Sequence, residues 1–174
     1  LATVERAADG GGARVRALDH GESVTLAAAA AAPVTVRCRP GALLGPPWAK
    51  RENAYVVLGG GEPAGGGIYY EPHGEWGGWP APPLAAEREH VGVLITPCSS
   101  QSLAPLRRFG PAFPLVKGET LARALDELRP TSLVPLANGE LDAAGLAARF
   151  VRAGDPVASE ATLPADVAFV RAPL

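Results

Sequence analysis

The sequence lacks the features that mark membrane proteins and nucleic-acid-binding proteins. Its longest apolar stretch, Leu26–Pro33, is mostly alanine and is much shorter than the roughly 20 residues that span a bilayer. Only 20% of the 174 residues are charged, and the net charge is −2. Because no basic stripe with interleaved aromatic residues is present, we expect neither nucleic acid nor a membrane as a partner. A hydrophobic content of 47% is instead typical of a globular protein with a real core.

Several catalytic motifs are also missing. No Gly-x-Ser-x-Gly motif and no partner histidine accompany Ser99 and Ser100, so serine catalysis is not expected. The glycine-rich run 59–67 lacks the Gly-Lys-Ser/Thr of a phosphate-binding loop. The two cysteines, Cys38 and Cys98, lie in strand-like runs without zinc-finger spacing. We expect two buried free thiols rather than nucleophiles, and a disulfide between them is the alternative.

The first half of the chain carries the period-two alternation of β-strands. The segments that we predict to form an antiparallel meander are Ala13–Leu18, Ser23–Leu26 and Val34–Arg39. A turn is predicted at Asp19-His20-Gly21, which leaves His20 solvated. A hairpin is predicted for Ala54–Leu58 and Ile68–Tyr70. The run Val91–Thr96 is continuously apolar, as in a strand covered on both faces, and His90 precedes it as a residue without a site role.

The last third changes to helical spacing. Within Thr120–Arg129 four apolar residues repeat at i, i+3, i+4 and i+7 and predict one buried helix face, namely Leu121, Ala124, Leu125 and Leu128. Pro130 is expected to end this helix. Ser132–Leu136 is predicted to be a buried strand, and Asp142–Ala153 a second amphipathic helix. A meander followed by a β-α-β-α tail indicates an α/β (α+β) fold, with parallel strands in the tail.

Three segments resemble a plant and algal branch of the metallo-β-lactamase superfamily. The first combines Gly-Pro-Pro-Trp at 45–48 with Glu-Asn-Ala-Tyr at 52–55, and one departure from the branch is Ala54, where glycine is usual. The second is Ile-Tyr-Tyr-Glu-Pro-His at 68–73. The third runs from Ile-Thr-Pro at 95–97 through 113–119 to 133–142. The resemblance implies that residues 1–174 form a single, partial domain, the C-terminal half of a four-layer αββα metallo-β-lactamase-like sandwich.

The resemblance also bears on metal binding. Active members of the superfamily hold metal with a His-x-His-x-Asp-His loop, a later aspartate after a strand, and a last histidine. No such loop occurs here, and we expect it to precede Leu1, with the chain truncated. The resemblance places His73 at the aspartate position and Ala137, which has no ligating atom, at the last histidine. His73 is therefore the candidate ligand for zinc or iron, with Glu71 on the same strand face, and a hydrogen-bonded structural role is the alternative.

Two functions of different classes follow from the resemblance. The first is a metal-dependent hydrolase with an incomplete ligand set, in which the metal would activate water toward a small-molecule ester, lactone or phosphoester. The alternative is a non-catalytic binding or interaction descendant of the fold. The tryptophans are expected to pack under loops rather than to stack on a ligand, and they are Trp48, Trp76 and Trp79.

A half-sandwich would leave one face of a sheet bare. Exposed apolar area of that size exceeds what a monomer usually carries. We therefore expect the chain to need its N-terminal half or to self-associate. The resemblance to plant and algal proteins implies the chloroplast or the cytoplasm as its location.

Overall fold

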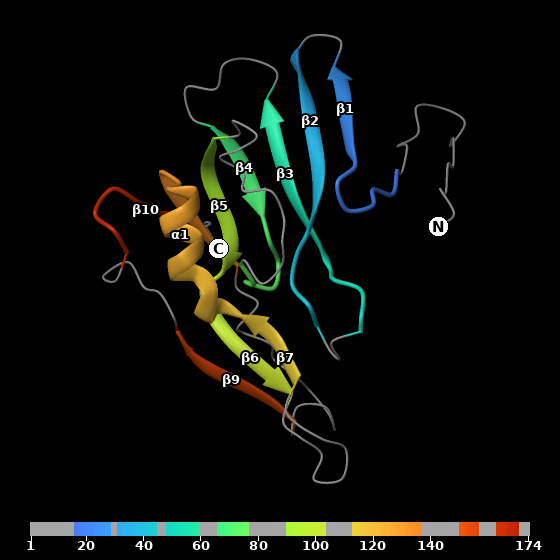
Figure 1. Cartoon of the computed structure of the whole chain (residues 1–174). Helices are drawn as coiled ribbons and strands as arrows, with labels where there is room; N and C mark the ends of the chain where they lie inside the picture. The colour runs from blue at the N-terminus through green and yellow to red at the C-terminus, as the bar shows by residue number, and fades with distance from the viewer. Residues whose placement is uncertain are drawn as a thin grey trace, which may run out of the picture.

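The fold is mixed α/β, mostly sheet, and a computed structural model describes it over residues 16–28, 31–44, 48–59, 66–76, 90–103, 113–136, 150–156 and 163–170 (Figure 1). The strands are β1 (Ser23–Ala28), β2 (Ala31–Pro40), β3 (Asn53–Gly59), β4 (Gly67–Tyr70), β5 (Val91–Pro97), β6 (Ser99–Leu103), β7 (Phe113–Lys117), β8 (Ser132–Leu136), β9 (Val151–Pro156) and β10 (Ala168–Phe169). A 3₁₀ turn, η2 (Gly118–Thr120), leads into the short helix α1 (Leu121–Leu128). Within the described ranges, no helix has the length and apolar character needed to cross a membrane.

The strands form two sheets. A seven-stranded sheet has the order β1-β2-β3-β4-β5-β8-β10, and a three-stranded sheet has the order β7-β6-β9. Strands β1 to β4 pair antiparallel in chain order, which confirms a meander and the predicted β3–β4 hairpin. From β4 onward the neighbours β5, β8 and β10 run parallel. The large sheet therefore changes from an antiparallel to a parallel half at β4.

The prediction of a strand at Ala13–Leu18 is wrong for the part of it that the structure describes. Residues Arg16–Leu18 have no regular structure, and the rest of the prediction lies outside the described residues. Arg16 and Ala17 are exposed, so the alternation there has no apolar face to bury. The predicted turn follows and is confirmed, because the Glu22 N–H donates to the Asp19 carbonyl over 2.9 Å and Gly21 adopts a φ of +88°.

The helix prediction is confirmed for α1. All four residues of the predicted apolar face are buried, namely Leu121, Ala124, Leu125 and Leu128. Arg129 ends the helix in the left-handed conformation, where its N–H reaches the Leu125 carbonyl over 2.9 Å. The following strand β8 pairs parallel with β5, so the β-α-β rhythm of the tail is confirmed up to this point.

The second predicted helix, Asp142–Ala153, is wrong at its described end. Residues 151–153 belong to β9, which pairs antiparallel with β6. Residues 142–149 lie outside the described residues. Strand β6, with the sequence SSQSL, has too few apolar residues for a period-two signal. The small sheet therefore depends on pairing between distant segments rather than on local pattern.

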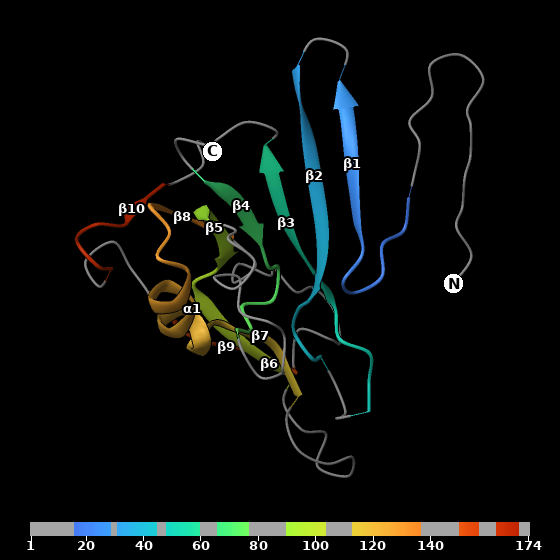
Figure 2. The ribbon, with the colours of Figure 1, turned by 45° about the horizontal axis from the view of Figure 1, so that its top comes forward.

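The core lies on one face of the large sheet. The buried residues that the sheet contributes to it are Ala54, Val56, Tyr69, Val91, Leu94 and Leu133, and the four buried residues of α1 pack with them. The register places these sheet residues side by side, with Tyr69 opposite Leu94, and Leu94 opposite Leu133. Figures 1 and 2 show α1 beside β5, with the β1–β2 hairpin standing away from it. The helix therefore covers the parallel half of the sheet on this face.

We predict that Leu121→Ala lowers the free energy of unfolding by about 3 kcal/mol, because it removes a buried side chain and leaves a cavity. Leu121 is 2% exposed in the core between α1 and the sheet. Urea denaturation at one fixed protein concentration measures the change. The matched control on the exposed face of α1, Asp126→Ala, should shift stability by no more than about 0.5 kcal/mol. Equal stabilities of the two variants would contradict the assigned core.

Candidate functional site

The carboxyl ends of the parallel strands β4, β5 and β8 lie at one edge of the large sheet. Glu71–His73 follow β4, and Cys98 follows β5. Ala137, which follows β8, lies outside the described residues. Ligands of sheets with parallel strands commonly bind beyond these carboxyl ends. The structure thus confirms that His73 lies at a strand end, and this edge is the candidate site.

Glu71 is buried at this edge, with 2% of its surface exposed. Its Oε1 accepts the N–H of Ala42 over 3.2 Å, and its Oε2 accepts the N–H of His73 over 3.1 Å. The N–H groups of Gly74 and Glu75 also donate to the carboxylate. Burial raises the pKa of Glu71 to about 7, and these amide hydrogen bonds offset only part of the rise. The carboxylate therefore ties the loop after β2 to the loop after β4.

His73 is half-buried, and its ring is held by the backbone of β7. Nδ1 lies 3.1 Å from the carbonyl oxygen of Leu115, and the His73 carbonyl accepts the N–H of Lys117 over 2.6 Å. Because a carbonyl only accepts, Nδ1 carries the hydrogen in this contact, and in a neutral ring Nε2 keeps its lone pair. Metal-ligating histidines are commonly oriented in this way by a backbone carbonyl on the other ring nitrogen.

Glu71 and His73 do not share a strand face, so that prediction is wrong. Strand β4 ends at Tyr70, and Pro72 and His73 form a turn. Glu71 instead points inward and binds the main chain of its own loop. Gly74 allows the turn with a φ of +75°, and a Cβ there would approach the backbone of Gly118 to 3.1 Å. The loop is thus shaped to lie against the start of α1.

The described residues do not fit a metal ion by themselves. No group of three His, Cys, Asp or Glu residues within the described ranges could hold one. Both oxygens of Glu71 are engaged by amides. Glu75 is paired with the cationic side chains of Arg51 and Lys117. His73 therefore offers one ligand atom, Nε2, but the described part of the chain brings no set of three ligands together.

Glu75 forms a partly buried ion-pair network in the same loop. Its carboxylate lies 3.2 Å from Arg51 Nη1 and 2.8 Å from Lys117 Nζ, and it accepts the N–H of Leu43 over 2.6 Å. Burial raises the pKa of Glu75, but the Lys117 and Leu43 hydrogen bonds and the charges of Lys117 and Arg51 outweigh it, so the pKa is lowered. The network joins β7 and the segment before β3 to the loop after β4.

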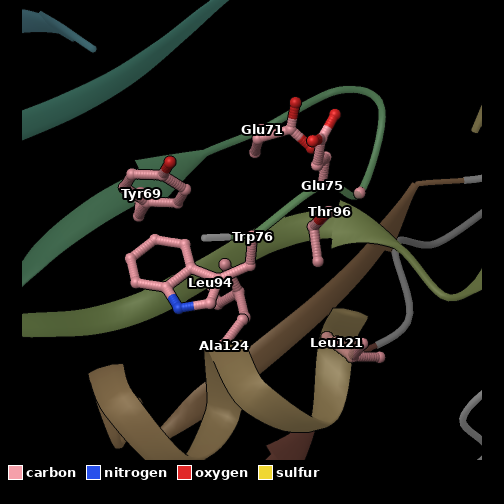
Figure 3. A pocket seen from close by; sticks show the side chains of 9 residues that line it. Tyr69, Glu71, Glu75, Trp76, Leu94, Thr96, Leu121 and Ala124 are labelled. Carbon is pink, nitrogen blue, oxygen red and sulfur yellow. The ribbon is translucent and has the colours of Figure 1, made fainter. Parts of the chain in front are cut away.

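A small cavity lies between β4, β5 and α1 (Figure 3). Its volume of about 10 Å³ is at the lower limit for one water molecule. Its lining residues are Tyr69, Glu71, Gly74, Glu75, Trp76, Leu94, Thr96, Leu121 and Ala124. The Trp76 ring meets Tyr69 edge-on, with centroids 5.4 Å apart, and its Nε1–H donates to Glu127 over 2.8 Å. The cavity is too small for a substrate and belongs to the packing of this edge.

The other polar residues considered in the sequence lie away from His73 or bind neighbouring groups. His20 lies in the predicted turn and is partly exposed, and its Nε2 lies 3.3 Å from the Glu52 carbonyl oxygen in an exposed contact. His90 is exposed before β5, at the opposite end of the strands from His73. Ser100 donates its hydroxyl hydrogen to Glu119 over 2.6 Å.

The cysteine prediction is confirmed, and the tryptophan prediction is confirmed in part. Cys38 and Cys98 are free and buried. Trp76 packs against the core beneath the loop after β4. Trp48 is 85% exposed, so the prediction that it packs under a loop is wrong. Trp79 lies outside the described residues.

Sequence reasoning missed Glu75 and Thr120 as residues that build this edge. Thr120 Oγ1 accepts the N–H of Trp76 over 2.7 Å and donates to the Gly74 carbonyl over 2.6 Å. Glu75 and Lys117 are separated by 42 positions, and Thr120 and Trp76 by 44. No local pattern signals partners so far apart. Only the position of Glu75 two residues after His73 could have drawn attention to it.

Comparisons with known proteins find no protein-family model, no curated protein and no solved structure that matches the chain. The structure itself shows a mixed α/β chain, mostly sheet with one short helix in its described part, and a polar loop at the carboxyl ends of its parallel strands.

We predict that Glu71 makes stability fall as the pH rises from about 5 to about 7. Burial raises the pKa of Glu71 to about 7 in the fold, from its ordinary value of 4.5. The folded state therefore keeps a proton that the unfolded state releases, so the stabilisation is complete below pH 4.5 and is lost as the pH rises through 7. The loss is on the order of 3 kcal/mol.

Urea denaturation from pH 5 to pH 8 measures this slope. In Glu71→Gln the side chain no longer titrates, so the fall should disappear, whatever the variant's absolute stability. The control variant Glu52→Gln changes an exposed carboxyl and should keep the fall. An unchanged slope in Glu71→Gln would show that another group carries the pH dependence.

Proposed function

We propose that this chain is a metallo-β-lactamase-like protein, the C-terminal half of a four-layer αββα sandwich, which acts in metal-dependent hydrolysis of a small-molecule substrate. Its ligand for zinc or iron is His73. The observation that carries the proposal is the setting of that residue. His73 follows a parallel strand, and its Nδ1 is held by the Leu115 carbonyl, which leaves Nε2 as the nitrogen for a metal.

The meeting of the three resembling segments supports the proposal. Arg51, which lies between the two parts of the first segment, pairs with Glu75, which closely follows the second, and Glu75 pairs with Lys117 of the third. His73 of the second segment contacts Leu115 of the third. Segments that are far apart in the sequence thus come together at the carboxyl ends of β4 and β5. Convergence at one edge favours a shared role over three unrelated likenesses.

Metal-dependent hydrolysis needs a metal ion that is held by several protein ligands. A bound zinc or iron ion would polarise the scissile group and lower the pKa of a bound water molecule. The described residues form no group of three ligands, and a metal site needs three or more protein ligands for hydrolysis. The further ligands would have to come from residues beyond the described ranges or from another polypeptide segment. No hydrolytic step is therefore assigned to the described residues.

A second candidate function is non-catalytic binding or interaction. The observation that favours it is Ala137, which stands where the resemblance implies the last metal-ligating histidine. A methyl side chain has no lone pair to offer a metal. In this case the hydrogen bond between His73 and Leu115 serves only to fix the loop after β4 on β7.

We predict that His73→Ala lowers the zinc and iron content of the protein at least tenfold, because it removes the candidate ligand. The chain, alone and in a version extended upstream of Leu1, is purified without chelators, and its metal content per polypeptide is measured by mass spectrometry. The matched control, His90→Ala, removes an exposed imidazole at the other end of the parallel strands and should leave the metal content unchanged.

Metal below about a tenth of an equivalent in both versions would refute the hydrolase and favour the binding protein. Metal that is present but equal in wild type and His73→Ala would refute His73 as the ligand. Hydrolysis of an ester, a lactone and a phosphodiester by the extended version, assayed with and without chelator, separates the two candidate functions.

A further inference from the structure

The loop after β4, which carries His73, lies on the segment from β7 to α1 and is hydrogen-bonded to it at several points. The His73 ring and carbonyl bind the main chain of β7, at Leu115 and Lys117. The carbonyl of Gly74, the next residue in the loop, accepts the hydroxyl hydrogen of Thr120 over 2.6 Å. His73 is thus held by β7 directly and by Thr120 through the residue that follows it.

The hydroxyl of Thr120 is used entirely for this loop. Its oxygen accepts the N–H of Trp76 over 2.7 Å. Its single hydrogen goes to the Gly74 carbonyl at 2.6 Å rather than to the Lys117 carbonyl, which is 3.4 Å away. Thr120 stands at the N-cap of α1, where threonine commonly binds the N–H groups of its own helix, yet it makes no side-chain cap hydrogen bond. The side chain therefore serves the loop rather than the helix that it precedes.

The two ends of the loop are fixed independently of Thr120. At its start, the Glu71 carboxylate binds the N–H groups of Ala42 and His73. At its end, the Trp76 ring meets Tyr69 edge-on with centroids 5.4 Å apart, and Trp76 Nε1–H donates to Glu127 of α1 over 2.8 Å. Between these ends, one hydroxyl bridges residues 74 and 76. Its removal would leave a half-buried carbonyl and N–H without partners, which is costly.

We propose that Thr120 is a positioning residue of the candidate site, which keeps the His73 ring against Leu115 with the hydrogen on Nδ1 and the lone pair on Nε2. Without the hydroxyl, residues 74 and 76 regain hydrogen-bond partners only if the loop lifts toward water. The ring then loses the Leu115 carbonyl, the acceptor that selects the Nδ1–H form. The role of Nε2 as a metal ligand rests on the proposed function, whereas the form of the ring does not.

Nitrogen NMR of the histidine rings tests the proposal on the whole chain without metal, at about pH 8, where an ordinary imidazole is neutral. We expect the Nδ1–H form for His73 in the wild type, with His73→Ala assigning its resonances. Thr120→Val should shift both ring resonances toward the Nε2–H form, whereas Thr120→Ser keeps the hydroxyl and should retain the wild-type resonances. A general loss of stability would not change the ring form in molecules that stay folded.

The matched control is Thr131→Val. It removes a hydroxyl that donates to the Gly92 carbonyl over 3.0 Å, at the opposite end of the parallel strands from His73. The substitution and the lost hydrogen bond are of the same kind as in Thr120→Val, so the His73 resonances should stay as in the wild type. Circular dichroism checks the folding of each variant.

Hydrogen exchange of the wild type is a second measurement that needs no variant. The N–H of Trp76, bonded to Thr120, and that of Lys117, bonded to His73, should have protection factors within about tenfold of each other, because one opening of the loop releases both. Three results would overturn the proposal: the Nε2–H form in the wild type, a folded Thr120→Val with wild-type ring resonances, and a Trp76 N–H that exchanges far faster than that of Lys117. Because no metal is present, these results decide the role of Thr120 even if His73 binds none.

Discussion

The buried carboxylate of Glu71 is the interaction on which the candidate site depends. It accepts amide hydrogens from Ala42 on one side and from His73 on the other, so two loops that leave different strands share one acceptor. Main-chain N–H groups buried without an acceptor would be costly. The hydrogen bonds of Glu71 to Ala42 and His73 therefore fix the position of His73 and the path of the loop toward α1. Close packing at Gly41, where a Cβ would come within 3.1 Å of the carboxylate, leaves it little room to move.

The ion pairs of Glu75 extend the same arrangement outward. They attach the loop to β7 through Lys117 and to the segment before β3 through Arg51. A buried amide clamp and a partly buried ion pair differ in kind. Glu71 is removed from water and is held by main-chain N–H groups, and its burial raises its pKa. Glu75 is held by the charges of two cations, Arg51 and Lys117. Together they fix the edge that carries the proposed ligand.

The sequence predicted the elements whose signal is local. Helix α1 was found from the spacing of Leu121 and its neighbours, and β5 from a continuous apolar run, because in each case the buried face can be read within one segment. The small sheet was missed, since β6 is rich in serine and β9 carries Gly154 and Asp155, which disfavour strands. Its pairing is fixed by distant segments. In the site, sequence reasoning found His73 and its neighbour Glu71 but not their roles, because the inward turn of Glu71 depends on Ala42, 29 positions away.

The two free, buried thiols can report local opening of the fold, because each becomes reactive only when it is exposed. Burial raises the pKa of both, that of Cys98 to about 11, and only the thiolate reacts readily with alkylating reagents. Cys38 lies in β2, where its main chain bonds to the turn before β1, and Cys98 lies between the two sheets, under α1. Labelling of Cys38 thus reports fraying of the meander, while labelling of Cys98 reports separation of the helix from the sheets. A single modification experiment can therefore time the loosening of the antiparallel half and of the parallel half separately.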